Sequence, residues 1–484
     1  MRKNGLLKVI LIVLGVFLLI SGVLGILGYF IPELEGLFNI VPVGNVFLNF
    51  VQSFYYFYDT VVYLLVLGAF YGVLNEVTAY KKLIEKIVTG LKSHGKVVLI
   101  VITILFSILT AVTGQLSVLL IFVPFVVMII LGLGYDKLVA VSSTIVSMLI
   151  GLMSGIYVTF RDPNNYYEYS STTFEGVLGV DLYSNLWPKL ILLVLGTALL
   201  IFFVLRHINN VQKKKVKYEL NESNEVEVSE VTGDYKKIRT WPIIVVFALL
   251  FVILILGYMP WNTLFGIDCF DKFNEWLLGI KIGEFYIIPN LVSSNNYAFG
   301  NWASMGDYLS IILTLIIFTI IIKFIYNIKF SDVLNNFVNG AKKILPMVLI
   351  MILAYTVLVS TYNGAFVQSI ITWLNEVLGI NIGSSVLISA LGTLYHSDLY
   401  YTVSGTLLPM MQNVSDKTLY PTYILTFQTI YGIVSMIAPT SLFVVFAVKY
   451  FDIPYTSFVK YIWRFILMLF LLVLLVLLVL ALIL

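Results

Sequence analysis

Charged side chains are scarce in this sequence. Asp, Glu, Lys and Arg make up 11% of its 484 residues, whereas hydrophobic residues make up 60%. A soluble domain carries about 25% charged residues. The composition therefore excludes an ordinary soluble protein and predicts a chain that crosses a membrane several times.

Cysteine and histidine are also rare. The single cysteine, Cys269, excludes a disulfide framework within the chain and a cysteine-based zinc site. His94, His207 and His396 are widely separated, so we expect no metal site. The sequence has no Walker-type phosphate loop, no GxSxG elbow and no HExxH motif. We therefore expect neither an enzyme nor a bound cofactor.

Long uncharged apolar runs are what the sequence has instead. Val9–Phe30 is too long for a signal peptide and is interpreted as a first membrane span. About 20 apolar residues are enough to cross ~30 Å of hydrocarbon. Further spans are predicted at Thr60–Ala79, Leu138–Val158, Trp187–Leu205, Trp241–Met259, Leu309–Lys323, Leu345–Ser360, Thr422–Ala438, Ser441–Val448 and Phe465–Leu484.

Two apolar stretches, at about 97–133 and 384–411, are interrupted halfway by small or polar residues. The interruptions read "TAVTGQLS" at Thr110–Ser117 and "YHSDLYYTVSG" at Tyr395–Gly405. Each flanking apolar segment is short for a membrane span. We therefore predict two re-entrant helical hairpins, each of which enters and leaves the membrane on one side.

The distribution of positive charge predicts the orientation. With the N-terminus in the cytoplasm, 24 of the 29 Lys and Arg residues lie inside, in accordance with the positive-inside rule. The remaining five basic residues, which are predicted to lie outside, are Arg161, Lys189, Lys272, Lys281 and Lys417. This arrangement predicts a multi-pass protein of the plasma membrane.

Residues 206–240 form the most hydrophilic segment and are predicted to be a cytoplasmic linker. A role of this linker in binding lipid headgroups or a partner is the alternative. The linker separates a first half, 1–205, from a second half, 241–484. Three residue pairs mark matching places in the two halves at an offset of 285: Ala69 and Ala354, Pro124 and Pro409, and Tyr135 and Tyr420.

The predicted topology opens the first hairpin to the cytoplasm and the second to the outside. Inverted halves with broken helices that meet near the bilayer midplane are typical of secondary transporters. We therefore predict an all-α polytopic membrane protein with an inverted-repeat transporter fold and two re-entrant helical hairpins.

Three stretches carry a resemblance to a known family: "LGAFYGVLNEVTAYKKLIEKI" at Leu67–Ile87, "FVPFVVMIILGLGYDKLVAV" at Phe122–Val141, and Leu425–Ile462, which contains "IAPTSLF" and "DIPYTSFVKYI". The sequence resembles the YfcC/DcuC-like anaerobic dicarboxylate carriers of the ion transporter superfamily. The resemblance implies a carrier of dicarboxylates or of basic amino acids, and a homodimer fits the related folds.

The sequence departs from this family at the positions that would form its site. Thr113 and Gly114 replace an acidic pair, and Val158 and Thr159 replace an Asn-Pro. Leu399–Thr402 replaces a serine-rich hairpin tip, and Ile430 and Tyr431 replace a Gly-Asp. The matching residues that remain are Phe427, Gln428, Gly432, Pro439, Thr440 and Ser441.

Asp398 is the strongest candidate site residue. An ionisable group at membrane depth is costly, which favours a functional role. The alternative is that the second tip is hydrated and that Asp398 only caps the helix that begins near Leu399. At the offset of 285, Asp398 corresponds to Thr113.

Other polar residues lie at the two tips and at a predicted helix break. We expect contact with solute or ion from Thr113, Gly114, Gln115, Ser117, His396, Ser397, Asp398, Thr402, Gln428, Pro439, Thr440 and Ser441. The alternatives are that His396 faces water and that Pro439 only kinks a helix. The aromatic cluster at Phe54–Asp59 is interpreted as part of an interfacial belt.

These features favour a secondary transporter coupled to Na⁺ or H⁺, or an exchanger. Asp398 would repel a doubly charged anion, and neither predicted tip has an intramembrane Lys or Arg. An amino acid or a small peptide is therefore favoured over a dicarboxylate. The alternatives are a carboxylate or dicarboxylate carrier, and a channel or non-transporting membrane protein that retains the fold. We expect a small solute and membrane lipids as partners, and no nucleic acid.

Overall fold

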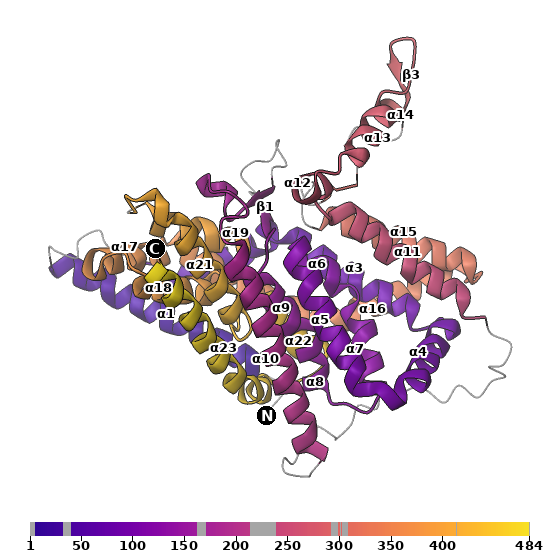
Figure 1. The fold of residues 1–484 in the computed structure, drawn as a ribbon, viewed down its shortest axis with the longest axis horizontal. Helices are drawn as coiled ribbons and strands as arrows, with labels where there is room; N and C mark the ends of the chain where they lie inside the picture. The colour runs from indigo at the N-terminus through magenta and orange to yellow at the C-terminus, as the bar shows by residue number, and fades with distance from the viewer. Residues whose placement is uncertain are drawn as a thin grey trace.

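The computed structural model describes residues 5–31, 40–161, 171–212, 239–291, 299–300, 302, 308–412 and 414–483. The chain is almost entirely helical (Figure 1). Helices satisfy their own backbone hydrogen bonds, which is what an apolar chain needs in lipid. Most of the predicted linker, 206–240, lies outside the described residues.

The first half begins with long apolar helices. Its helices are α1 (Gly5–Phe30), α2 (Val43–Tyr56), α3 (Tyr58–Leu74), α4 (Thr78–Leu91), η2 (Lys92–His94), α5 (Gly95–Thr113), α6 (Leu116–Leu120), α7 (Val123–Gly132), α8 (Lys137–Val141), η3 (Ser142–Val146), α9 (Ser147–Met153), η4 (Gly176–Leu178) and α10 (Leu186–Gln212).

The second half is also built of helices. Its helices are α11 (Trp241–Tyr258), α12 (Trp261–Phe265), α13 (Cys269–Leu278), α14 (Ile287–Leu291), α15 (Leu309–Ile325), α16 (Phe330–Asn363), α17 (Phe366–Leu378), α18 (Ile382–Tyr395), α19 (Leu399–Thr402), η8 (Val403–Leu407), α20 (Leu408–Met411), η9 (Lys417–Leu419), α21 (Tyr420–Ser435), α22 (Leu442–Tyr450) and α23 (Tyr455–Ile483).

Two small antiparallel sheets accompany the helices. Strand β1 (Thr159–Arg161) pairs with β2 (Ser171–Thr173), and β3 (Lys281–Ile282) pairs with β4 (Phe285–Tyr286). Helices α12 to α14 and strand β3 project from the helical body (Figure 1).

Both interrupted stretches fold into helical hairpins. Helix α5 ends at Gly114, which has the left-handed φ of +65° that favours glycine. The chain then returns through α6 and α7, so that Gly95 lies against the hydroxyl of Tyr135. In the second hairpin, the hydroxyl of Tyr423 lies 3.4 Å from the carbonyl oxygen of Ile380. The open ends of the first hairpin therefore lie together, and the segments that flank the second hairpin also meet.

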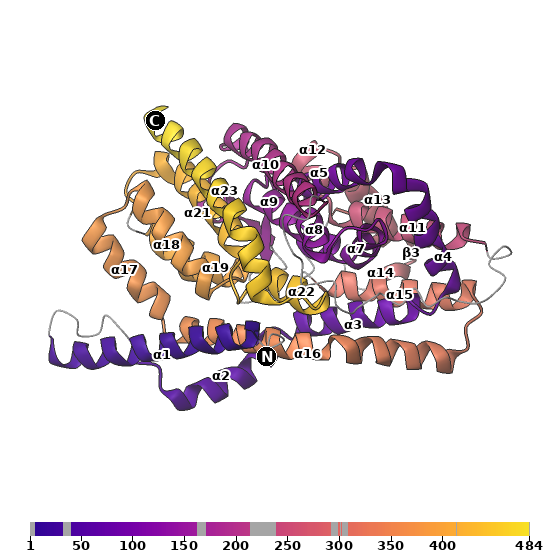
Figure 2. The ribbon, with the colours of Figure 1, turned by 90° about the horizontal axis from the view of Figure 1, so that it is seen from below.

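Helices that match by order in the two halves begin about 285 residues apart. Helix α5 begins at Gly95 and α18 at Ile382, and α8 begins at Lys137 and α21 at Tyr420. Helices α3 and α16 also correspond, and they pack closely side by side (Figure 2). Gly72 faces Gly340, while Phe57, just before α3, stacks on Tyr355 of α16, so the two helices run antiparallel. The inverted repeat and the re-entrant character of the hairpins stay predictions that this arrangement supports.

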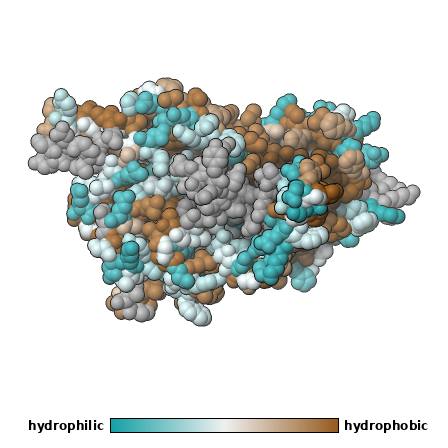
Figure 3. Space-filling model, turned by 90° about the horizontal axis from the view of Figure 1, so that it is seen from above, coloured by the Kyte–Doolittle hydropathy of each residue, from teal (hydrophilic) through white to brown (hydrophobic). Residues whose placement is uncertain are grey.

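The apolar helices fit a membrane protein. Six described helices are long and apolar enough to cross a membrane, or seven if the bent pair α2 and α3 counts as one further span. Apolar side chains cover much of the surface (Figure 3). Water would make so large an exposed apolar surface unfavourable, whereas lipid does not. The prediction of an all-α polytopic membrane protein is confirmed.

Several predicted bounds were wrong. The segments 80–96 and 323–346, which lie between the predicted spans and hairpins, are largely helical, and α16 begins at Phe330 and continues through Pro346 into the predicted span Leu345–Ser360. The sequence analysis did not predict α2 or α17 as separate helices. Both are amphipathic, with too few apolar residues in a row to be recognised as spans.

Candidate functional site: a cavity between two hairpin tips

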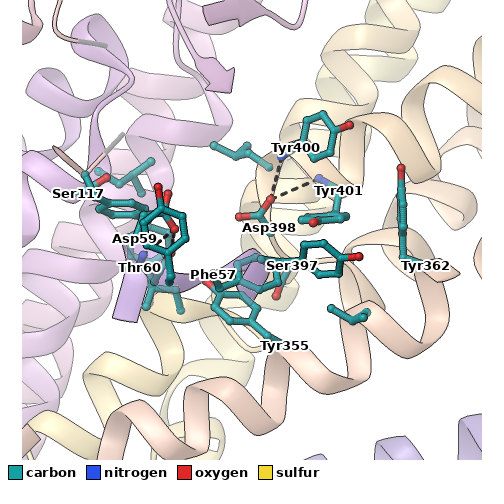
Figure 4. Close-up of a pocket in the computed structure, with 18 of the residues that line it drawn as sticks. Phe57, Asp59, Thr60, Ser117, Tyr355, Tyr362, Ser397, Asp398, Tyr400 and Tyr401 are labelled. Atoms are coloured by element: carbon teal, nitrogen blue, oxygen red, sulfur yellow. Dashed lines mark hydrogen bonds between the residues drawn. The ribbon is translucent and has the colours of Figure 1, made fainter. Parts of the chain in front are cut away.

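A cavity of about 550 Å³ lies between the tips of the two hairpins (Figure 4). Small-molecule sites typically have volumes of roughly 300–1,000 Å³. The first tip contributes Gly114, Gln115 and Ser117 to its wall, and the second contributes Ser397 and Asp398. Residues nearly 300 positions apart in the sequence thus face one space.

The first tip is held by hydrogen bonds to its backbone and side chains. The side-chain amide of Gln115 donates to the hydroxyl of Thr159 over 3.1 Å. The hydroxyl of Tyr63, on α3, donates to the carbonyl oxygen of Ser117 over 2.8 Å. A broken helix leaves such carbonyls without a partner in the helix. Residues of α3 and β1 therefore fix the tip in place.

At the second tip, Asp398 is the N-cap of α19. One carboxylate oxygen, Oδ1, accepts hydrogen bonds from the backbone N–H groups of Tyr400 and Tyr401 at 3.1 and 3.3 Å. Figure 4 shows the carboxylate in the wall of the cavity. Asp398 thus has the geometry of a helix cap and also lines the candidate site. The two interpretations of this residue are compatible.

Aromatic rings form much of the remaining wall. Phe57 stacks on Tyr355 with 3.6 Å between ring centroids, and the Tyr401 ring lies 5.5 Å from that of Phe57. The rings of Tyr362 and Tyr401 meet edge to face at 4.9 Å. Packed rings of this kind form a rigid and weakly polar wall.

Other predicted site residues support the tips without lining the cavity. The hydroxyl of Thr440 donates to the carbonyl oxygen of Leu394, at the end of α18, over 2.9 Å. The side-chain amide of Gln428 donates to the carbonyl oxygens of Leu152 and Gly155, where α9 ends. These two residues therefore satisfy backbone groups that the helix breaks expose.

The other predicted residues are also buried beside the cavity. Thr113 and Thr402 bond to the carbonyl oxygens of Leu109 and Asp398 within their own helices. The ring of His396 lies 3.0 Å from the Thr361 hydroxyl. Pro439 and Ser441 lie in the break between α21 and α22. Seven predicted site residues are therefore absent from the described cavity lining: Thr113, His396, Thr402, Gln428, Pro439, Thr440 and Ser441.

Sequence reasoning missed Asp59, which lies in the first turn of α3 and lines the cavity. Its cluster, Phe54–Asp59, was interpreted as an interfacial belt, but Tyr55 to Asp59 line the cavity. The carboxylate directly before the apolar run of α3 was a usable signal. Among the described residues that line the cavity, the charged side chains are Asp59 and Asp398.

The comparison with known families decides the class. The model of the C4-dicarboxylate anaerobic carrier family, DcuC, matches residues 56–482. This chain belongs to that family. The match extends from the aromatic cluster before α3 to the end of α23, so it includes both hairpins and every described residue that lines the cavity except Tyr55. The carrier is therefore a transport protein and not an enzyme, and the predicted family is confirmed.

Comparisons with individual proteins add little to the family match. No curated protein matches the sequence of the carrier. The crystal structure of the Alcanivorax borkumensis YdaH transporter, described as having an unusual topology, is similar at 13% identity and a TM-score of 0.41. That similarity covers 99% of this chain and 98% of the other.

The described part of the carrier holds no group of three or more His, Cys, Asp or Glu side chains that could bind a metal ion. The polar groups at the cavity are suited to holding a small solute or a single coupling ion. Carboxylate oxygens and hydroxyls of this kind bind ammonium groups, Na⁺ or a proton.

Proposed function

We propose that the carrier is a secondary transporter whose solute binds in the cavity between the two hairpin tips. The observation that carries this proposal is that both tips face one cavity of about 550 Å³. Broken helices in transporters place polar backbone and side-chain groups at a central site. The antiparallel packing of the corresponding helices α3 and α16 supports an inverted repeat, which would allow the site to open to either side.

For the solute, we favour an amino acid or a small peptide. Asp59 and Asp398 are the charged groups among the described lining residues. The negative field of these two carboxylates stabilises a bound ammonium group, whereas it destabilises a bound doubly charged anion. The cavity volume suits a molecule of this size.

A C4-dicarboxylate is the second candidate, because the family is described by that substrate. A dianion would need bound cations or protons to offset the lining carboxylates. The family match supports this candidate and the charge of the described lining supports the first. The two candidates predict opposite specificities.

Counterflow in proteoliposomes distinguishes them. Purified carrier is reconstituted with each unlabelled solute inside, and the uptake of the same labelled solute is followed with and without Na⁺. We expect an amino acid or dipeptide to give counterflow and succinate or fumarate to give none. Counterflow of succinate alone would establish the second candidate. Absence of counterflow with every solute would favour a channel or a non-transporting protein.

The remaining parts of the proposal concern the location, orientation and assembly of the carrier. The carrier would lie in the plasma membrane with a cytoplasmic N-terminus and a cytoplasmic linker at 206–240, because this orientation places most Lys and Arg residues inside. The halves 1–205 and 241–484 would each contribute one hairpin tip to the site. A homodimer fits the resemblance to related transporters.

A further inference from the structure

We propose that the solute of this carrier bears an N-alkylated ammonium group, which binds against Asp398 at the wall formed by the rings of Phe57, Tyr355 and Tyr401. This inference deepens the proposed function and rests on the cavity being the solute site. It narrows the favoured amino acids and small peptides to those whose amino group is N-alkylated.

The corner of the cavity at Asp398 is built from aromatic rings on separate elements. Phe57 precedes α3, Tyr355 belongs to α16 and Tyr401 to α19. Asp398 and the three rings all line the same cavity. Figure 4 shows these rings around the carboxylate. A cation held beside a carboxylate and aromatic faces is attracted by both, and aromatic cages are a known means of binding quaternary ammonium groups.

Part of the hydrogen-bonding capacity of this corner is occupied, and the Ser397 hydroxyl is buried there without a hydrogen-bond partner among the described residues. Oδ1 of Asp398 already accepts two backbone N–H groups. The carbonyl oxygen of Ser397 accepts the hydroxyl of Tyr431 over 2.7 Å. A primary ammonium brings three N–H donors, which need acceptors when they leave water. An N-methylated ammonium brings fewer donors and places methyl groups against the rings, so it fits this corner better.

The walls are rigid enough to discriminate between such groups. Phe57 and Tyr355 are 4% and 3% exposed, so their rings are fixed by packing on all sides except the cavity. Their mutual stacking at 3.6 Å holds both ring planes. Preorganised walls of this kind favour the ligand whose shape they match.

Binding of simple ammonium ions tests the inference without knowledge of the solute. The full-length carrier in detergent is titrated by calorimetry with tetramethylammonium, methylammonium and ammonium chloride at constant ionic strength. We expect tetramethylammonium to bind at least tenfold more tightly than methylammonium. Equal affinities, or no binding of tetramethylammonium, would overturn the inference.

Matched variants locate the binding. Tyr355→Leu removes the ring and should weaken tetramethylammonium binding by about 2- to 30-fold, whereas Tyr355→Phe keeps the ring and should stay within about twofold of the parent. Asp398→Asn should weaken binding at least tenfold while it keeps the helix cap. Tyr286→Leu, at an exposed tyrosine of β4, is the control for tetramethylammonium binding to a tyrosine outside the cavity. Unchanged binding in Tyr355→Leu and Asp398→Asn would contradict the proposed location.

Counterflow with the same protein separates this inference from the proposed function. If a solute shows counterflow that tetramethylammonium does not inhibit, the inference fails and the transporter stands. If tetramethylammonium binds as expected and no solute shows counterflow, the cation site stands and the proposed function fails.

Discussion

At the scale of single residues, Asp398 both caps helix α19 and lines the cavity. Its Oδ1 closes the first turn of α19, and its carboxylate faces the cavity. A group in this position can hold a proton or a cation and release it when the cavity changes. We therefore assign coupling to Asp398, as part of the proposed function.

The variant Asp398→Asn separates the two roles, because Asn caps helices about as well as Asp. We expect ion-driven uptake to fall at least tenfold, while exchange and thermal stability stay close to the parent. Uptake with and without gradients of H⁺ and Na⁺ measures this. Asp416→Asn is the control, since Asp416 also caps a helical turn but is exposed. Unchanged dependence on pH and Na⁺ would show that Asp398 is only a cap.

Gly114 determines the shape of the first tip. A Cβ atom there would lie 2.1 Å from the carbonyl oxygen of Tyr157, and the φ of +65° is strained for any other residue. We expect Gly114→Ala to displace the tip, lower the midpoint of thermal unfolding and abolish counterflow.

Gly134→Ala is the control for backbone strain alone, because Gly134 has a φ of +87° and nothing within 4 Å of its Cβ position. Gly134→Ala should lower the free energy of unfolding by about 1 kcal/mol and leave counterflow intact. Equal effects of the two substitutions would mean that contact with Tyr157 is unimportant.

The sequence was sufficient to find the polar tips but not the direction of every side chain. Asp398, Ser397, Gln115 and Ser117 line the cavity, as their position at a break suggested. Thr440 instead bonds to a backbone carbonyl at the end of α18. A hydroxyl in an apolar environment takes the nearest free carbonyl, and which one is nearest depends on packing that periodicity does not reveal.

At the scale of elements, the hairpins and most helices follow from apolar runs and their interruptions. The amphipathic helices α2 and α17 do not, because their apolar residues are spread over one face. The charged segment before the predicted span Leu345–Ser360 is also helical, because α16 begins at Phe330 and carries Lys342 and Lys343 ahead of its apolar part. A helix can carry charge at its ends and continue into the membrane.

A buried ion pair joins two elements of the first half. Lys189, near the start of α10, contacts Glu175, and each side chain is 1% exposed. The predicted orientation places Lys189 on the outer side of the membrane, and the structure buries its side chain within the protein. Removing one partner of such a pair leaves a buried charge, whereas removing both does not.

We expect Lys189→Met to lower the free energy of unfolding by about 3–5 kcal/mol. The double variant Glu175→Leu with Lys189→Met should recover most of that loss. Denaturant unfolding in detergent measures both values. A double variant no more stable than Lys189→Met would show that the pair itself, and not the isolated charge, determines stability here.

At the scale of the whole molecule, the account depends on the orientation in the membrane. Cys269 is exposed and lies in α13, within the projecting part of the chain. The charge distribution places it outside. An impermeant maleimide should therefore label Cys269 in intact cells.

Two variants control this labelling. Cys269→Ser should abolish it. Ser93→Cys in that background should react only after permeabilisation, because Ser93 is exposed and the predicted orientation places the neighbouring Lys92 and Lys96 in the cytoplasm. Labelling of Cys269 only after permeabilisation, with Ser93→Cys labelled in intact cells, would invert the topology.

The central claim is that the two hairpin tips form one solute site, and protection from thiol labelling tests it most directly. In a Cys269→Ser background, Ser117→Cys reports on the first tip and Leu399→Cys on the second; both positions line the cavity. We predict that a maleimide at either position blocks counterflow, and that the transported solute protects both positions over the same concentration range. Protection of one position only, at any solute concentration, would contradict a shared site.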